Sequence, residues 1–250
     1  MPKVLAMKER RILVINPNTS ESSTKRMQDK CREIAFPGTK VDAVNPPARP
    51  GFEIPSIGAY VDEAVCAPEA IKIAWRERNN YDGMIVACFS DPGLDAIKEL
   101  LDIPVIGIGE MAYHAAALLG HKFSILTVDR KWTPPKENYV KSVGVESKVA
   151  SIFPRVEARS PIEPTEQRKQ LIEAGKKAIQ DGAEVVILGC ADDIGYALGE
   201  DLGIPVIEPT AVALKFMEAL LMLGLKQSKI CRWKQPPESA GPIKYDRGLE

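Results

Sequence analysis

The chain has 250 residues, of which 45% are hydrophobic and 27% charged, and its formal net charge at pH 7 is −1. These values are ordinary for a soluble globular protein, and they leave no overall charge that would attract nucleic acid or an anionic membrane. The length is sufficient for one large α/β unit or for two small lobes with buried cores.

Strand and helix patterns alternate along the chain. Short apolar runs bounded by turn residues indicate buried strands, and longer segments with apolar residues at helical spacing indicate helices. Residues 45–51 hold three prolines and a glycine in seven positions, so they cannot form regular structure. The expected strands are 12–15, 41–44, 84–87, 105–108, 123–128, 151–156, 183–190 and 204–207, and the expected helices are 21–34, 58–79, 92–101, 111–119, 136–143, 163–181 and 211–223.

This alternation predicts mainly parallel sheets. We therefore expect the α/β fold class, as two pseudo-symmetric Rossmann-like (flavodoxin-like) lobes with an active site in the cleft between them. The predicted boundaries are 1–130 for the first lobe and 131–225 for the second, and the last helix, about 210–225, could pack back on the first lobe. Residues 226–250 carry prolines and charges with little periodicity, which is typical of a loosely held tail or of a contact in a homo-oligomer.

Two segments repeat one pattern, and each places a cysteine at the same point. Residues 81–88 and 183–190 are β-runs that end on a cysteine, and a helical stretch begins just after each of them. Both then reach an Ile-Pro-Val-Ile run, 15 residues after Cys88 and 14 residues after Cys190. Ligands of open α/β sheets bind beyond the carboxyl ends of the strands. Two such units facing a common cleft would bring two thiols to one small molecule.

Cys88 and Cys190 are therefore the candidate catalytic residues. Unpaired backbone N–H groups and the positive end of a helix favour a thiolate at such positions. Two independent placements of this kind favour a functional pair over two core thiols. Cys31 and Cys66 fit the interiors of helices, and Cys231 is an incidental thiol of the tail.

The remaining composition argues against metals and disulfides. There is no Cys-x-x-Cys pair, and the only histidines are His114 and His121, so we expect no metal site, no histidine-based triad and no cofactor. Neither a signal peptide nor an apolar span is recognisable, which indicates a cytoplasmic protein with reduced thiols. The expected partners are a small-molecule substrate and further copies of the chain, with no nucleic acid and no membrane.

Four segments together carry a family resemblance. They are 16–20 (Asn-Pro-Asn-Thr-Ser), 87–94 (Ala-Cys-Phe-Ser-Asp-Pro-Gly-Leu), 103–110 (Ile-Pro-Val-Ile-Gly-Ile-Gly-Glu) and 188–191 (Leu-Gly-Cys-Ala). In this order, over roughly residues 11–225, they resemble the hydantoin and allantoin racemases of the aspartate/glutamate racemase superfamily. The resemblance implies two α/β lobes, an active site between them, no cofactor, and Cys88 and Cys190 as acid and base.

The chemistry of a hydantoin suits these residues. Its ring carries a hydrogen on a carbon beside an amide carbonyl, so removal of that proton by a thiolate gives an enolate-like anion. Backbone N–H groups after each cysteine can stabilise the negative oxygen. The resemblance implies two further contacts to the ring, from the amide side chain of Asn16 after the first strand and from the hydroxyl of Thr127 at a strand end. The Thr127 hydroxyl could equally bond backbone groups at the end of its own strand. The candidate substrate-binding residues are Asn16, Phe89, Ser90, Thr127, Ala191 and Asp192.

One departure from the family pattern leaves alternatives open. Asp192 and Asp193 stand where the racemases commonly continue Gly-Met; an aspartate there can cap a helix, but its charge would raise the pKa of Cys190. The alternatives are an amino-acid racemase, a decarboxylase or a cis–trans isomerase of the same fold, and a non-catalytic small-molecule binder. A dinucleotide enzyme is a further alternative, since residues 107–112 and Asp129 have the spacing of a dinucleotide-binding fingerprint.

Overall fold

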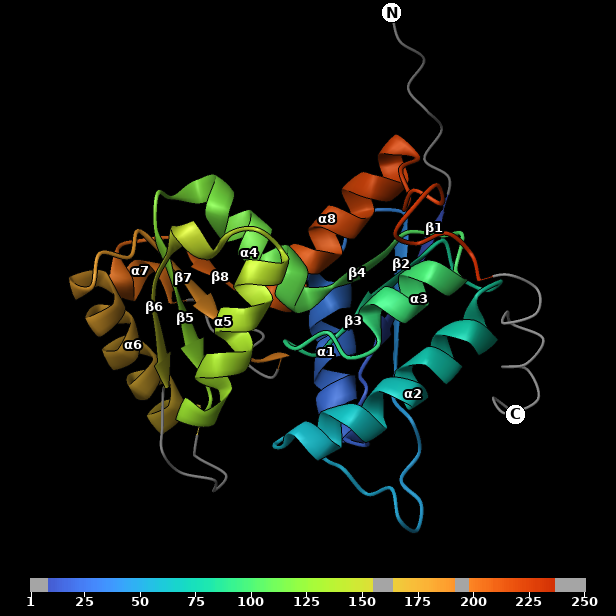
Figure 1. The fold of residues 1–250 in the computed structure, drawn as a ribbon, viewed down its shortest axis with the longest axis horizontal. Coiled ribbons are helices and arrows are strands. Elements are labelled where there is room, and N and C mark those ends of the chain that lie inside the picture. The colour runs from blue at the N-terminus through green and yellow to red at the C-terminus, as the bar shows by residue number, and fades with distance from the viewer. Residues whose placement is uncertain (1–8, 155–163, 192–197, 237–250) are drawn as a thin grey trace, which may run out of the picture. The chain divides into compact units, whose positions relative to one another are not determined.

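The computed structural model describes residues 9–154, 164–191 and 198–236. The chain forms two compact units: unit 1 contains the residues up to Gly107 and from Ala213 onwards, and unit 2 contains Ile108–Val212. Each unit has a four-stranded parallel sheet flanked by helices, which confirms the predicted α/β class (Figure 1). No helix in the described ranges is both long and apolar enough to cross a bilayer.

The sheet of unit 1 has the order β2-β1-β3-β4, and all its neighbouring strands are parallel. β1 and β3 lie in the middle of the sheet and are almost entirely buried, because helices cover both of its faces. The strands are β1 (Arg10–Ile15), β2 (Thr39–Val44), β3 (Gly83–Val86) and β4 (Val105–Gly107).

Helices α2 (Tyr60–Glu77) and α3 (Leu94–Leu100) pack their apolar residues against one face of this sheet. On the other face lie α1 (Glu21–Ile34) and α8 (Pro209–Leu223) (Figure 1). Gly83 of β3 allows α8 a close approach, because a Cβ at that position would lie 2.5 Å from Met217 Sδ.

The sheet of unit 2 has the order β6-β5-β7-β8 and is also parallel. Helix α6 buries Leu171, Ala174 and Ala178 against it. The strands are β5 (Phe123–Thr127), β6 (Val149–Pro154), β7 (Val185–Leu188) and β8 (Val206–Ile207), and the helices are α4 (Ile108–Leu119), α5 (Thr133–Ser142), α6 (Pro164–Gln180) and α7 (Gly199–Leu202), with two 3₁₀ turns, Arg130–Trp132 and Glu146–Lys148.

The two sheets have the same topology. In each, the first strand of the unit pairs with the second on one side and with the third on the other, and the third pairs with the fourth. β3 precedes Cys88 and β7 precedes Cys190, so the two cysteines follow topologically equivalent strands. The repeat seen in the sequence is therefore a repeat of structure.

The unit boundary differs from the predicted division near residue 130. α4 and β5 belong to unit 2, because β5 pairs with β6 and β7 rather than with any strand of unit 1. Most of α8 returns to unit 1, where Glu218 is fully buried, accepts a 2.7 Å hydrogen bond from the Phe36 N–H and pairs with Lys215 at 2.9 Å.

The described part of the predicted tail, residues 226–236, is fastened to unit 1. Gln227 bonds both the N–H and the C=O of Val105, at 2.9 and 2.6 Å, and so continues the edge of β4. Lys229 donates to the carbonyls of Lys98 and Glu99 at the end of α3. This segment is thus not loosely held, while residues 237–250 lie outside the described ranges.

Candidate active site

Asn16 and Cys88 lie at the same edge of the sheet of unit 1. Each follows the carboxyl end of a central strand, with Ile15 of β1 in register with Val86 of β3. The pairing continues one step further, because the Ala87 N–H donates to the Ile15 carbonyl at 2.8 Å. Ligands of parallel sheets bind at this edge.

The loop from Cys88 to α3 is a tight turn built on Asp91. The Asp91 N–H donates to the Cys88 carbonyl at 2.9 Å, and the Leu94 N–H donates to the Asp91 carbonyl at 3.1 Å. Asp91 has φ +50°, the left-handed region that aspartate adopts more readily than most residues. Phe89 is buried, while Ser90 is partly exposed and its hydroxyl lies 3.5 Å from Cys88 Sγ.

Cys88 is partly exposed as a residue, yet little solvent surrounds its sulfur, and this desolvation raises the pKa of its thiol above the ordinary value of a cysteine. Hydrogen bonds from the Ser90 hydroxyl and backbone lower this pKa, and the negative charges of Asp91 and Glu63 raise it. The net effect favours the protonated thiol.

Cys66 of α2 is a second thiol near Cys88. It is fully buried, as expected for a core cysteine, and desolvation together with the proximity of Cys88 raises the pKa of Cys66 to about 12. The helical pattern of residues 58–79 predicted burial but contained no signal for this proximity.

The side chain of Asn16 is engaged by its own loop. It is fully buried, and its Nδ2 donates to Asn18 Oδ1 at 2.9 Å and to Thr24 Oγ1 at 3.0 Å. Its Oδ1 accepts from the Asn18 N–H at 3.3 Å. These bonds shape the turn that leads to Ser20, which caps α1. A contact between Asn16 and a substrate stays a prediction.

In unit 2, Cys190 follows β7 and is partly exposed. Gly189 allows its strand to lie close to β5, since a Cβ there would lie 2.6 Å from the Leu126 carbonyl oxygen and 3.3 Å from Thr127 Cα. The Gly189 N–H donates to that carbonyl at 2.8 Å. Thr127 and the residue before Cys190 are thus immediate neighbours at the carboxyl edge of this sheet.

The other predicted residues of unit 2 are two buried residues and one that lies outside the described ranges. Thr127 is fully buried, and its Oγ1 has no hydrogen-bond partner in the described part of the chain. Ala191 is buried directly after Cys190. Asp192 and Asp193 lie outside the described residues. None of the five cysteines takes part in a disulfide, and no cluster of metal ligands occurs within the described ranges.

The dinucleotide alternative loses its structural basis. Gly107 ends β4 and α4 begins at Ile108, so no glycine-rich loop separates strand and helix. The space at the Cα of Gly107 is taken by the Asp91 carboxyl group, which would repel a phosphate. The Asp129 side chain accepts a hydrogen bond from the Lys131 N–H and caps a 3₁₀ turn.

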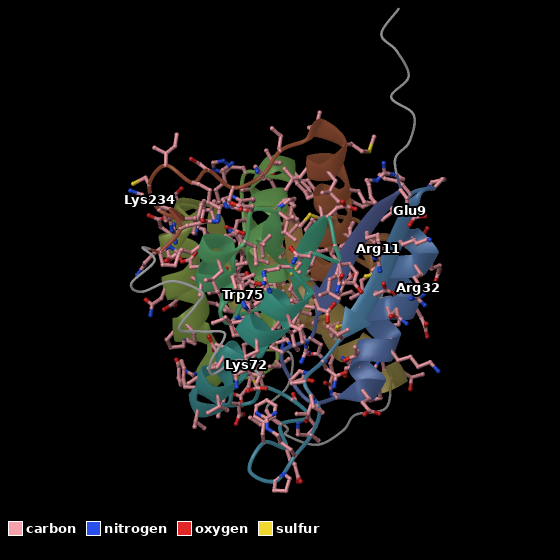
Figure 2. All side chains as sticks on the ribbon, turned by 90° about the vertical axis from the view of Figure 1, so that its right-hand side faces the viewer. Glu9, Arg11, Arg32, Lys72, Trp75 and Lys234 are labelled. Carbon is pink, nitrogen blue, oxygen red and sulfur yellow. The ribbon has the colours of Figure 1, made fainter. Side chains whose placement is uncertain are left out.

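A hollow of about 530 Å³ lies near the amino ends of β1 and β2, away from the cysteine edge. Figure 2 shows three of its residues, Glu9, Arg11 and Arg32, beside β1, β2 and α1. Four of its charged side chains form two ion pairs, with Arg32 2.7 Å from Asp42 and Lys40 2.9 Å from Glu9. This hollow is a solvated charged surface rather than part of the cysteine site.

Comparisons with known proteins agree over nearly the whole chain. The Asp/Glu/Hydantoin racemase family model matches residues 12–217. A hydantoin racemase of Paenarthrobacter aurescens is 37% identical over 235 residues, which cover 91% of this chain and 98% of the relative. A hydantoin racemase of Pseudomonas sp. (strain NS671) is 35% identical over 232 residues, which cover 90% and 92%.

Solved structures give the same result. Allantoin racemase from Klebsiella pneumoniae matches with a TM-score of 0.84 at 32% identity, covering 92% of this chain and 94% of that one. Allantoin racemase from Pseudomonas fluorescens matches with a TM-score of 0.80 at 30% identity, covering 91% and 98%. The chain therefore belongs to the Asp/Glu/hydantoin racemase family, and it is an isomerase of the racemase class.

Proposed function

We propose that this protein racemises a five-membered cyclic ureide, a 5-substituted hydantoin or allantoin, by proton transfer between Cys88 and Cys190. The observation that carries the proposal is the equivalent placement of the two cysteines, each directly after the third strand of a repeated sheet. The hydantoin and allantoin racemases that resemble the chain support this choice of ring.

In the proposed mechanism one cysteine acts as a thiolate and takes the proton from the ring carbon beside the carbonyl. The electron pair of that C–H bond moves into an enolate, and the other cysteine donates its thiol proton to the opposite face of the carbon. Each turnover exchanges the protonation states of the two thiols and inverts the carbon. The raised pKa of Cys88 supports the assignment of Cys88 as the acid of the resting enzyme.

Backbone N–H groups of Phe89, Ser90 and Ala191 are the proposed donors to the enolate oxygen, because they follow the two cysteines directly. Asn16, Thr127 and Asp192 are the proposed contacts to the ring. The step needs neither metal nor redox cofactor, because the carbonyl beside the carbon and the N–H donors stabilise the anion. We further propose a cytoplasmic homo-oligomer; light scattering with mass determination measures its subunit number.

The test uses single enantiomers of 5-methylhydantoin and of allantoin in D₂O. Loss of optical rotation together with deuterium uptake at the ring carbon, seen by NMR and unaffected by a chelator, is the expected result. Deuterium uptake must exceed that of a blank without enzyme, since these rings exchange slowly by themselves. Turnover of an amino acid, decarboxylation or cis–trans isomerisation instead of ring racemisation would identify another chemistry of this fold. Binding without exchange would identify a non-catalytic binder.

A further inference from the structure

Two threonines lie at the carboxyl ends of the strands that flank the strand of Cys190, one at the end of β5 and one just after β8. In the sheet of unit 2, β7 lies between β5 and β8. Thr127 ends β5, and Thr210 follows β8 as the second residue of α8. Ile187 and Ile207 are paired in register, and Cys190 and Thr210 each come three residues after their member of this pair. The backbone therefore brings Thr127, Cys190 and Thr210 to one edge of one sheet.

Both hydroxyls are buried and lack partners. Thr127 and Thr210 are each 0% exposed, and neither Oγ1 has a hydrogen-bond partner among the residues that the structure describes. A buried hydroxyl without a partner destabilises the folded state, because it loses its hydrogen bonds to water and regains none. Two such groups on either side of a candidate catalytic strand call for an explanation.

The local structure around Thr210 does not explain why its buried hydroxyl lacks a partner. A threonine at the start of a helix ordinarily caps backbone N–H groups, but here the Glu208 carboxylate performs that task. It accepts from the N–H groups of Thr210 and Ala211 at 3.0 and 2.9 Å. Elsewhere in the chain a buried helical threonine does find a partner, since Thr24 Oγ1 donates to the Ser20 carbonyl at 2.8 Å.

We propose that Thr210 is a substrate-binding residue whose hydroxyl, together with that of Thr127, bonds the polar edge of the ring on the side of Cys190. This inference rests on the proposed function and adds a residue to it. A cyclic ureide carries C=O and N–H groups in alternation around its ring, and a threonine hydroxyl can donate to the one or accept from the other. The two hydroxyls gain their missing partners when the substrate binds.

The experiment measures racemisation kinetics and thermal unfolding of Thr210→Val, which replaces the hydroxyl by a methyl group of nearly the same shape. KM for 5-methylhydantoin or allantoin should rise about five- to tenfold, the loss expected for one hydrogen bond to a neutral group. The unfolding midpoint should stay the same or increase, because the variant removes an unpaired buried hydroxyl. Thr210→Ser, which keeps the hydroxyl, should restore most of the lost affinity.

Thr39→Val is the matched control. Thr39 belongs to β2 in unit 1 and accepts a 3.2 Å hydrogen bond from Arg10 Nε near the hollow at the other edge of its sheet. This variant should leave KM unchanged. If Thr210→Val lowers the midpoint because the larger methyl group is crowded, Thr210→Ala removes the same hydroxyl without adding an atom and gives the same comparison.

The outcomes separate this inference from the function on which it rests. If the wild-type protein turns over neither ring, both are overturned. If the wild type racemises and the kinetics of Thr210→Val equal those of the wild type while its midpoint increases, the proposed function stands. Thr210 is then a buried hydroxyl without a role in binding.

Discussion

The carboxyl group of Asp91 fills the space that a side chain at Gly107 would need. A Cβ on Gly107 would lie 2.1 Å from Asp91 Cγ and 2.3 Å from each carboxyl oxygen. Asp91 belongs to the loop that follows Cys88, and Gly107 ends the neighbouring strand β4. The absence of a side chain at Gly107 therefore allows the Asp91 carboxyl group of the Cys88 loop to lie against the end of β4.

Gly107→Ala should lower the free energy of unfolding by about 1–3 kcal/mol, as overpacking of a tight site does. Its racemisation rate should fall as well, because the displaced carboxyl group moves the Cys88 loop. Urea unfolding and initial rates measure these effects. Gly58→Ala is the control, since its nearest neighbour would be Asp62 Oδ2 at 3.8 Å and no positive φ is required there.

A double-mutant cycle tests the pairing of these two residues. Asp91→Gly removes the carboxyl group and suits the φ of +50° at this position. Combined with Gly107→Ala, it should restore much of the stability that the single Gly107 variant loses. Additive losses in the double variant would mean that the two side-chain positions do not compete for the same space.

The reactivity of the Cys88 thiol should depend on its two loop neighbours in opposite directions. The Ser90 hydrogen bonds lower the pKa of Cys88, so Ser90→Ala should raise it; the Asp91 charge raises that pKa, so Asp91→Asn should lower it. Because the thiolate is the reactive form, alkylation of Cys88 should speed up as the pH rises. Relative to the wild type, the midpoint of this increase should lie at higher pH in Ser90→Ala and at lower pH in Asp91→Asn.

Mass spectrometry of the Cys88 peptide after timed treatment with iodoacetamide gives this pH profile. Glu63→Gln serves as a third variant, since the charge of Glu63 also raises the pKa of Cys88. At pH values well below 12 the neighbouring Cys66 remains a thiol, because burial raises its pKa to about 12. A common shift of all three variants in one direction would contradict the electrostatic account.

The two-base mechanism predicts different exchange patterns for the two cysteine variants. Cys88→Ser and Cys190→Ser should each slow racemisation by about 10²-fold or more, because one of the two proton-transfer groups is lost. The remaining cysteine can still remove and return a proton on its own face. Each variant should therefore exchange deuterium into one enantiomer without inverting it, and the two variants should prefer opposite enantiomers.

NMR of each pure enantiomer with each variant in D₂O measures this pattern. Cys31→Ser and Cys231→Ser are the controls, one a buried thiol of α1 and the other an exposed thiol near the end of the described chain. Both should racemise at the wild-type rate per folded molecule. Normal racemisation by either Cys88→Ser or Cys190→Ser would refute the assignment.

The segment after α8 should contribute to the stability of unit 1. Gln227→Ala removes two hydrogen bonds to the Val105 backbone of the edge strand β4, and it should cost about 1–2 kcal/mol of unfolding free energy. Gln235→Ala is a matched control, since that glutamine makes one exposed bond to Asp102 at 3.1 Å. Its change should stay within about 0.5 kcal/mol. If the two variants lose the same unfolding free energy in urea, the hydrogen bonds of Gln227 to the Val105 backbone do not stabilise unit 1 more than the exposed bond of Gln235 does.

Local patterns in the sequence were enough to predict the α/β class and the repeated cysteine unit. Buried parallel strands are short continuous apolar runs, and in the helices between them the apolar residues recur with a different period. Both kinds of element can therefore be recognised from the sequence. The repeat of strand, cysteine, helix and Ile-Pro-Val-Ile then placed Cys88 and Cys190 at equivalent points. The family resemblance added the ring chemistry and the residues Asn16 and Thr127.

Contacts between distant residues were decided only by the tertiary structure. The predicted division near residue 130 differs from the boundary of the compact units, because β5 pairs with strands of unit 2 and the sequence of a strand does not show which strands it pairs with. Three further contacts could not be predicted from the sequence. They are the Asp91 carboxyl group beside Gly107, the Cys66 thiol near Cys88, and the hydrogen bonds of Gln227 to β4.

Burial and hydrogen-bond satisfaction also required the fold. Asn16 and Thr127 are both polar residues at strand ends, yet the amide of Asn16 is engaged within its own turn while the hydroxyl of Thr127 has no partner among the described residues. Thr210 lies at the start of a helix, and only the structure shows that Glu208 takes the capping role there. Such differences depend on which atoms surround a side chain in space, and a linear pattern of residue types does not contain that information.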